Sequence, residues 1–187
     1  MSVYENCPVL ENEKYVLRFV KKDDASDLLK VYSDKHALPF FNSDNCDGDN
    51  FYYSSVERME KAIDFWLSSY ETRWFVRWAI IDKETSKAIG TIELFHRVAD
   101  DDFNGVGVLR LDVGSCHEEA EGLERILSLI LKSAFELFEC DTIITKAPIY
   151  AVERIKALQQ CGFEKSDSLL VGTNDHYAYN GYWSIKK

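Results

Sequence analysis

Acidic side chains and a tyrosine are the residues of this chain whose chemistry best suits proton transfer. Glu93 shares a face with Thr91 in a β-rich run, so we expect a half-buried carboxylate whose pKa is raised. Asp112, in a second such run, either joins Glu93 in this role or pairs with Arg110 at the surface. Tyr150 precedes the final helical pattern, where its hydroxyl can act as an acid or its ring can simply pack. Acid–base chemistry at two strands is therefore the first hypothesis.

Weaker candidates surround these residues. His96 is a candidate base because histidine as a residue type suits proton transfer near neutral pH, although a lone histidine is more often structural. Asp44, Asp47 and Asp49 lie in a polar loop at 41–50 and either attract a cationic amine or are simply solvated. The five cysteines are scattered without a C-x-x-C pair, so we expect neither a disulfide framework nor a metal site.

Four glutamates gather where the longest helical pattern begins, at Glu118, Glu119, Glu121 and Glu124. Acidic residues in a first turn stabilise a helix by about 0.3–1 kcal/mol each, which is the structural interpretation. The alternative is a site adapted against anions, because carboxylates repel the phosphates that free amides at a helix N-terminus would bind. Ser115 and Glu118 also have the spacing of a capping box, which predicts that the helix caps itself.

The chain as a whole is acidic, with 22 Lys and Arg against 32 Asp and Glu and a net charge of -10. This balance argues against nucleic acid and favours a neutral or cationic partner. Its 187 residues, 46% of them hydrophobic, predict a single domain over 1–187 with an N-terminal extension at 1–14. Neither a leader pattern nor an apolar run of about 18 residues is visible, so we expect a cytoplasmic protein without membrane contact.

The apolar pattern predicts an α/β domain. The β-rich runs are at 15–19, 75–81, 88–95, 106–113, 142–145, 169–171 and 179–185. Helical spacing occurs after Asp24 to about Asp34, from Ser54 or Ser55 to Leu67, and at 118–138 and 152–160. This order implies a mixed sheet with helices on its faces.

Four short motifs occur along the chain in a characteristic order. They are Leu17-Arg18, Trp78-Ala79-Ile80-Ile81, Ala88-Ile89-Gly90-Thr91-Ile92 and Gln160-Cys161-Gly162-Phe163. Together they resemble the GNAT superfamily of N-acetyltransferases, especially its ribosomal-protein-type branch, over roughly residues 15–185. The resemblance implies a GNAT fold, with a mixed sheet of about seven strands splayed in the middle and about four helices on its faces.

The resemblance also implies acetyl-CoA as the cofactor, lying in the splayed gap with its pyrophosphate at the N-terminus of the 118–138 helix. In an acetyl transfer of this kind Glu93 would be the base and Tyr150 the acid. The implied cofactor contacts are Leu111, Asp112, Val113, Glu119, Ala120, Glu121, Gly122, Leu123 and Arg154.

This sequence departs from the family pattern at the cofactor loop. The usual loop glycines fall on Glu119 and Glu121, and the usual Asn and Ser of the last helix fall on Ala151 and Arg154. Two hypotheses follow. The first is an acetyl-CoA-dependent N-acetyltransferase acting on a primary amine of a small molecule, peptide or protein N-terminus. The second is an inactive GNAT-fold binding module that has lost acetyl-CoA and acts through its acidic surface or as a homodimer.

Overall fold

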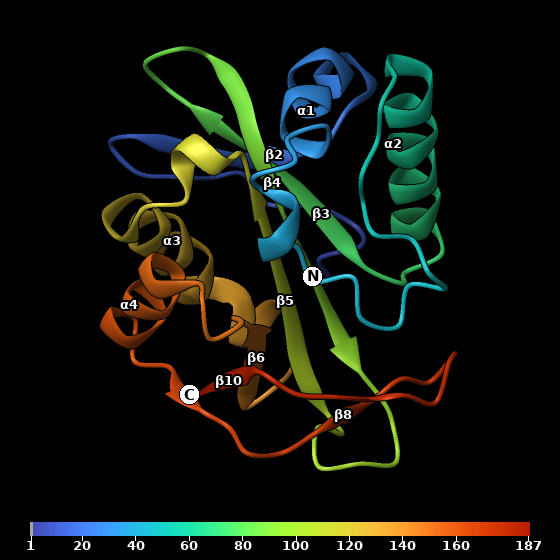
Figure 1. Ribbon diagram of the computed structural model, residues 1–187, viewed down its shortest axis with the longest axis vertical. Coiled ribbons are helices and arrows are strands. Elements are labelled where there is room, and N and C mark those ends of the chain that lie inside the picture. Colours follow the sequence, from blue (N-terminus) through green and yellow to red (C-terminus); the bar gives the residue numbers. More distant parts are fainter. Residues whose placement is uncertain (1) are drawn as a thin grey trace.

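The structure is a computed structural model that describes residues 2–187, and Figure 1 shows the course of the chain. Its strands are β1 (Leu10–Glu11), β2 (Tyr15–Phe19), β3 (Val76–Asp82), β4 (Lys87–Arg97), β5 (Val106–Val113), β6 (Thr142–Lys146), β7 (Glu164–Lys165), β8 (Leu170–Val171), β9 (Ala178–Tyr179) and β10 (Tyr182–Lys186). Its α-helices are α1 (Ala25–Tyr32), α2 (Val56–Glu71), α3 (Ala120–Leu137) and α4 (Val152–Gln160).

Most of these strands form one twisted sheet in the order β1-β2-β3-β4-β5-β6-β10-β7, which has eight strands within the described chain. Neighbouring strands are antiparallel except β5 and β6, which are parallel. The long helix α3 supplies the crossover that a parallel pair requires. The expected mixed α/β sheet is confirmed.

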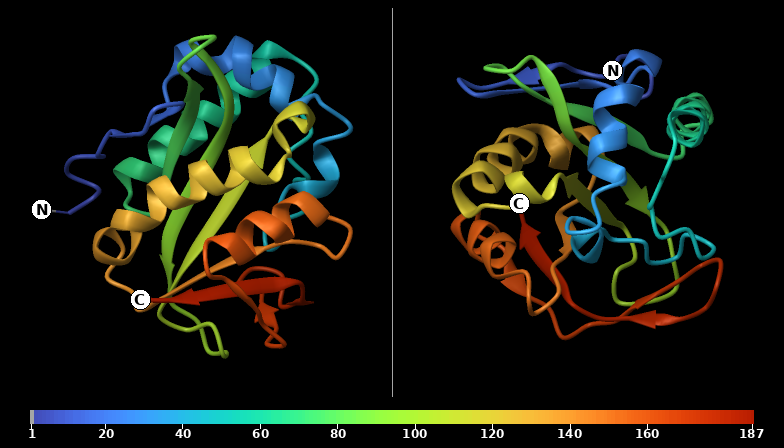
Figure 2. Two further views of the ribbon diagram at one scale, coloured as in Figure 1. Left: turned by 90° about the vertical axis from the view of Figure 1, so that its left-hand side faces the viewer. Right: turned by 45° about the horizontal axis from the view of Figure 1, so that its top comes forward.

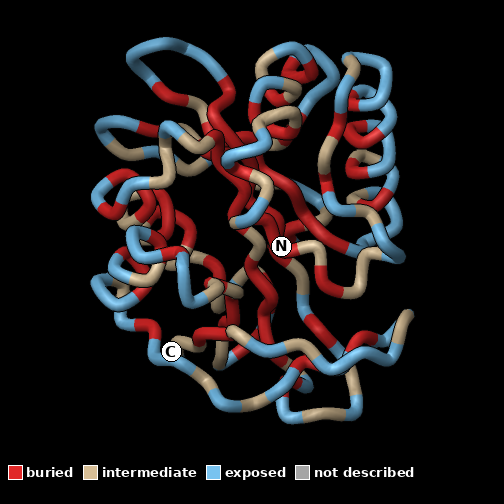
Figure 3. Tube along the Cα trace, viewed as in Figure 1, coloured by how far each residue is buried: buried red, intermediate tan, exposed pale blue. Residues whose placement is uncertain are grey.

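The helices cover both faces of the sheet, with α1 and α2 on one side and α3 and α4 on the other (Figure 2). Strict alternation along β5 accounts for this, because Leu109 and Leu111 pack in the core beneath α3 whereas Arg110 and Asp112 point to the opposite face. Burial follows the central strands, which form the dark red centre of Figure 3.

The sheet is splayed between β5 and β6, as expected. Strand β5 pairs with β4 at eight positions, up to Val113, but with β6 only from Gly107 to Leu109. Within residues 2–187, the last four residues of β5 therefore have no partner on β6, and a gap opens beside them.

The helix starts differ in part from the prediction. Ser55 caps α2, and its Oγ accepts a hydrogen bond from the Arg58 amide at 3.2 Å. The start of α3 is not capped by Ser115, because residues 115–117 form a separate 3-10 turn. Instead Glu119 caps α3 through its own carboxylate, which accepts from the Gly122 amide at 3.1 Å. The helix therefore caps itself as predicted, but through Glu119 and not through Ser115 and Glu118. The Glu118 side chain is instead bound to Arg154.

The C-terminal strands divide between two sheets. The run at 179–185 joins the main sheet, as predicted, but only from Tyr182 onward as strand β10, which lies beside β6, while Tyr179 belongs to β9. Strand β8 pairs instead with β9, so the run at 169–171 was wrongly expected to complete the main sheet. These two short strands form a hairpin that projects beyond the end of the main sheet near the loop between β4 and β5 (Figure 1). Among the described residues, no helix has the length and apolar character needed to cross a membrane.

Candidate functional site

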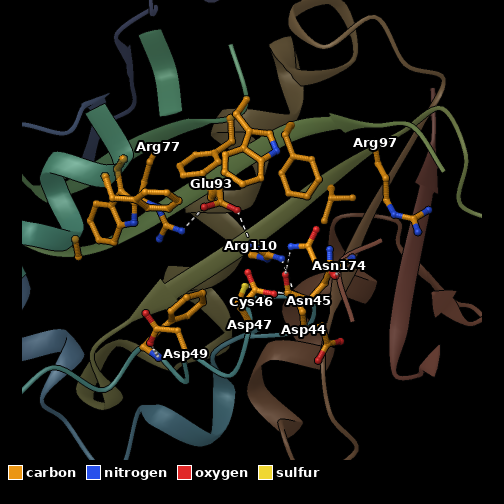
Figure 4. Close-up of a pocket in the computed structure, with 18 of the residues that line it drawn as sticks. Asp44, Asn45, Cys46, Asp47, Asp49, Arg77, Glu93, Arg97, Arg110 and Asn174 are labelled. Carbon is orange, nitrogen blue, oxygen red and sulfur yellow. Dashed lines mark hydrogen bonds and ion pairs between the residues drawn. The ribbon is translucent and has the colours of Figure 1, made fainter. Parts of the chain in front are cut away.

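A cavity of about 440 Å³ lies on the sheet face that carries α1 and α2. Its walls come from the loop at 41–53, from α2, from β3, β4 and β5, and from the hairpin at 170–179 (Figure 4). This volume falls within the usual range for small-molecule sites, roughly 300–1,000 Å³. The cavity is the candidate functional site.

The floor of the cavity is a ladder of charged side chains across three strands. Arg77 on β3 stands opposite Glu93 on β4, which stands opposite Arg110 on β5. Arg77 donates to one oxygen of the Glu93 carboxylate, and Arg110 donates to the other at 2.8 Å. Side-chain exposure is only 2% for Arg77 and Glu93 and 11% for Arg110. The sheet register thus places one carboxylate between two guanidinium groups.

Asp112 extends this network along the same face of the sheet, outside the cavity lining. Its carboxylate accepts from Tyr32 Oη at 2.8 Å and from Arg77 Nη1 at 3.3 Å. Tyr32 and Arg77 also contact Thr91 Oγ1, at 2.7 and 3.0 Å. The prediction that Asp112 pairs with Arg110 at the surface is wrong, because Asp112 is fully buried and its partner is on β3.

The two carboxylates are shifted in opposite directions. Burial alone would raise the pKa of Glu93, but the charges and hydrogen bonds of Arg77 and Arg110 outweigh it and lower the pKa. Glu93 was expected to be half buried with a raised pKa, and both expectations are wrong. Burial does raise the pKa of Asp112, and the nearby charge of Arg77 only partly offsets it. Glu93 is therefore the fixed negative charge, and Asp112 holds a proton more readily than an ordinary aspartate.

Some polar atoms of this network lack partners. Within residues 2–187, the Nε atoms of Arg77 and Arg110 and Oδ1 of Asp112 are buried without a hydrogen bond. Such atoms are rare in folded proteins and each one costs free energy. Both arginines line the cavity, but these nitrogen atoms are themselves buried, so a ligand in the cavity does not reach them in this arrangement.

Aromatic side chains form the wall above the floor. Trp66 is buried, and the Arg77 guanidinium stacks over its ring at 4.2 Å from the centroid. Phe75 lies near the guanidinium of Arg77, and Phe95 lies near that of Arg110. The exposed rings of Phe65 and Trp74 meet edge to face, with their centroids 6.1 Å apart. Trp78 does not belong to this wall, because it packs in the core against Phe138 on the other face.

The polar loop at 41–50 closes the opposite side. Asp44 is buried there, where its carboxylate binds Lys146 Nζ at 2.6 Å and accepts from Tyr182 Oη at 2.9 Å. Asn45 holds the hairpin in place, because its side-chain oxygen accepts from the Asn174 amide at 2.8 Å. Lys146 neutralises Asp44, so this aspartate is not a free anionic group that could attract a cationic amine.

A buried ion pair fills the gap between β5 and β6. Arg154 of α4 binds both oxygens of the Glu118 carboxylate, at 2.6 and 2.8 Å. Its Nη1 also donates to the carbonyl oxygens of Leu111 at 2.8 Å and Phe40 at 3.1 Å. The guanidinium thus satisfies a β5 carbonyl at the splay, the edge where the resemblance places the cofactor.

The amides at the start of α3 are also engaged by carboxylates of this chain. The Ala120 amide donates to Glu153 at 3.0 Å, and the Gly122 amide donates to Glu119 at 3.1 Å. A Cβ added at Gly122 would lie 2.6 Å from the Glu119 carboxylate, so the capping group already sits tightly against this turn. Leu123 donates to the Glu119 carbonyl within the helix.

The remaining carboxylates have local partners. Glu121 pairs with Arg125 at 2.9 Å on the exposed side of α3, and Glu124 accepts from Ser128 at 2.8 Å. A pyrophosphate at this helix start would have to displace two carboxylates from the amides and would meet their negative charge. The residues present therefore do not fit the phosphates of coenzyme A in this arrangement.

Two further candidates lie apart from the floor. Tyr150 is not among the described residues that line the cavity. Its side chain is exposed, donates a hydrogen bond to the Pro39 carbonyl at 2.8 Å and packs near Phe40. The structure thus does not bring Tyr150 into the cavity that contains Glu93. His96 lies at the cavity rim, with Nδ1 at 2.8 Å from the Phe138 carbonyl.

The element order, the β5–β6 splay and the helix on each side of it define the GNAT fold, which this chain has. Ribosomal-protein-S5-alanine acetyltransferase from Vibrio fischeri is similar, with a TM-score of 0.70 and 17% identity over 96% of both chains. Spermidine N-acetyltransferase from Vibrio cholerae, solved with CoA and spermine, is similar with a TM-score of 0.65 and 12% identity over 94% of this chain and 96% of its own. At such identities the likeness shows the fold alone.

Sequence comparison gives a partial match. The "Uncharacterized N-acetyltransferase YoaA" of Bacillus subtilis (strain 168) is 26% identical over 92 residues, which are 49% of this chain and 48% of the relative. The match thus spans about half the length of either protein. No family model matches the chain.

Several residues of the site were missed by sequence reasoning. Arg77 interrupts an otherwise apolar strand, and that charge inside a buried run was a usable signal. Lys146, at the end of β6, offered no such signal in the sequence, because its partner Asp44 lies 102 residues away in the chain.

Proposed function

We propose that this protein binds a small organic ligand in the cavity above Glu93 and does not transfer an acyl group from coenzyme A. One contrast carries the proposal. Two amides at the start of α3 and the Leu111 carbonyl at the splay, which a GNAT fold would offer to the donor, are already bound within the chain, whereas the cavity has room for a small ligand.

The energetic argument concerns Arg154. Its guanidinium and the Glu118 carboxylate are 3% and 6% exposed, so moving either one away would leave a buried charge without its partner. Such a rupture costs about 3–5 kcal/mol in proteins. A donor that needed this gap would lose that amount of binding free energy, equivalent to roughly a hundredfold or more in affinity.

The test is an acetyl-transfer assay. The purified protein is incubated with acetyl-CoA and a panel of primary amines that includes polyamines, aromatic amines and N-terminal peptides, and acetylated products are measured by mass spectrometry. Spermidine N-acetyltransferase from Vibrio cholerae with spermine is the positive control for the assay. The proposal expects no product above the enzyme-free rate, and turnover with any amine contradicts it.

A second candidate function is N-acetyltransfer to a primary amine, and a specific observation favours it. The sheet opens between β5 and β6 as the fold requires, and the Glu93 carboxylate is among the groups that line the cavity. If the assay gives turnover, Glu93→Gln should reduce it at neutral pH. A variant as active as the wild type would remove Glu93 from the reaction.

A further inference from the structure

The charges around the cavity are balanced by ion pairs within the chain. Seven charged side chains of the lining take part in these pairs, and several of their partners lie just outside the lining. The pairs are Arg77 with Glu93 and Asp112, Arg110 with Glu93, Arg97 with Asp101, Lys146 with Asp44, and Arg58 with Asp49. Two more charged residues of the lining, Asp47 and Lys61, are exposed and have opposite charges, so they add no net charge.

The charged groups of the floor are already used by one another. Both oxygens of the Glu93 carboxylate accept from arginines, so each guanidinium keeps a partner even without the charge of Asp112. The Nε atoms of Arg77 and Arg110 are buried out of reach of a ligand. An ion that entered the cavity would lose its water without gaining a counter-charge, or would have to break an existing pair. The floor therefore favours an uncharged ligand.

The walls of the cavity are rich in aromatic rings. The lining includes four phenylalanines and two tryptophans, which are Phe51, Phe65, Trp66, Trp74, Phe75 and Phe95. Figure 4 shows aromatic rings close to the labelled Glu93 carboxylate. Rings of this kind attract another ring through offset or edge-to-face contacts in addition to the burial of apolar area. The walls thus favour an aromatic ligand over an aliphatic one.

Two of these rings lie in solvent although they are large and apolar. Phe65 is 52% exposed and Trp74 is 58% exposed. They contact each other, and both contact the buried Phe75. Exposed apolar side chains that gather at a cavity are typical of a ligand-binding surface, in contrast to single exposed residues. A ring that entered the cavity would cover apolar surface that is now in water.

The size of the cavity sets the size of the ligand. An apolar cavity of about 150 Å³ is enough to hold one benzene molecule. This cavity has a volume of about 440 Å³. It therefore has room for two or three fused rings.

We propose that the cavity binds an uncharged aromatic compound of two or three fused rings, which packs against Trp66, Trp74 and Phe75 above the paired charges of the floor. This inference rests on the proposed function, because it names the class of ligand that the same cavity takes. The charged floor positions the walls and does not itself bind an ion.

The experiment is isothermal titration with a series of ligands that share one ring system. The uncharged 2-naphthol is compared with the anion 2-naphthoate, with the cation 2-naphthylmethylamine, and with the saturated alcohol decahydro-2-naphthol. We expect 2-naphthol to bind at least about tenfold more tightly than either ion, because the ions find no counter-charge. It should also bind roughly threefold or more tightly than the saturated alcohol, because only an aromatic ring gains the contacts between rings.

Three results of this titration overturn the inference. The first is an affinity for either ion that equals or exceeds the affinity for 2-naphthol. The second is equal or tighter binding of the saturated alcohol. The third is the absence of saturable 2-naphthol binding at millimolar concentration.

A variant of the wall tests the place of the ring. Trp74→Ala removes an exposed ring of the lining and should weaken 2-naphthol binding several-fold in a protein that still folds. The control is Tyr177→Ala, which removes an exposed ring that is not among the lining residues and should leave the affinity unchanged. Wild-type affinity in Trp74→Ala, or an equal loss in both variants, contradicts the inference.

A variant of one ion pair tests the argument from charge balance. Asp49→Asn removes the carboxylate that pairs with Arg58 at the cavity, while an amide can still accept from the Phe51 backbone. The freed guanidinium should make 2-naphthoate bind roughly threefold or more tightly than it binds to the wild type, with 2-naphthol little changed. Glu121→Gln changes the net charge equally on α3, outside the lining, and should leave both affinities unchanged. No gain for 2-naphthoate in Asp49→Asn would mean that charge balance does not select the ligand.

The outcomes distinguish this inference from the proposed function. Acetyl transfer to an amine, with the preference for 2-naphthol retained, would refute the proposed function alone. A preference for 2-naphthoate or 2-naphthylmethylamine without acetyl transfer would refute only the choice of ligand class. Acetyl transfer together with a preference for the amine would refute both.

Discussion

The ion pair between Arg154 and Glu118 can be tested by removing the arginine. Arg154→Ala deletes two bonds to Glu118 and one bond to each of the Leu111 and Phe40 carbonyls. It leaves a carboxylate that is 6% exposed without its counter-charge. We therefore expect the free energy of unfolding to fall by about 3–5 kcal/mol, the range for breaking a buried pair.

Replacing both partners should cost much less than the sum of the single changes. The double variant Glu118→Met with Arg154→Met fills the same space without a stranded charge, and such exchanges are often close to neutral. We expect the double variant to recover most of the lost stability. In the double-mutant cycle with the single variants Glu118→Met and Arg154→Met, the coupling free energy should be about 2 kcal/mol or more.

The assay is urea unfolding followed by tryptophan fluorescence, with Arg125→Ala as the control. Arg125 pairs with Glu121 on the exposed side of α3, so its removal should change stability by about 0.5 kcal/mol or less. A loss below about 1 kcal/mol in Arg154→Ala would mean that the guanidinium is readily displaced. The argument that the gap is filled would then be wrong.

Three more predictions concern the same region. Asp112→Asn removes a carboxyl group whose pKa is raised from its ordinary value of 3.8. The free energy of unfolding of the wild type, relative to this variant, should therefore fall as the pH rises from about 3.8 through the raised pKa. Parallel pH profiles of the two proteins in urea unfolding would contradict the assignment. Gly90→Ala should lower the free energy of unfolding by about 1–3 kcal/mol in the same assay, because the new Cβ would clash with the Asp112 carbonyl oxygen. An unchanged urea midpoint would show that β4 and β5 can move apart to accommodate the methyl group. Glu119→Gly frees the Gly122 amide at little cost to the cap, but Arg154 and Glu153 stay in place, so we expect no measurable CoA binding by titration, and micromolar binding would mean that Glu119 alone excludes the cofactor.

Local patterns were sufficient to predict much of the fold. Strand β5 and helix α4 begin and end where alternation and helical spacing placed them, because the side-chain period of each element is visible in its own sequence. The short edge strands β1 and β7, of two residues each, carry no periodicity and were not predicted. Their existence depends on the neighbouring strand rather than on their own sequence.

The candidate site was harder to predict because its chemistry depends on strand register. Glu93 was correctly placed on a strand, but the direction of its pKa shift was wrong because Arg77 and Arg110 stand directly opposite it on both sides. No local pattern determines which residues face each other across three strands. For the same reason the sequence left open whether Arg154 meets a phosphate, whereas the folded chain places Glu118 against it.

The most direct test of the central claim is isothermal titration of the wild-type protein with acetyl-CoA and with CoA at moderate salt. Because Arg154 fills the gap and two carboxylates hold the α3 amides, we predict no saturable heat up to millimolar cofactor. Binding at micromolar concentration would contradict the account, since it would require the cofactor to displace these groups at little cost, and acyl transfer would then become the favoured function.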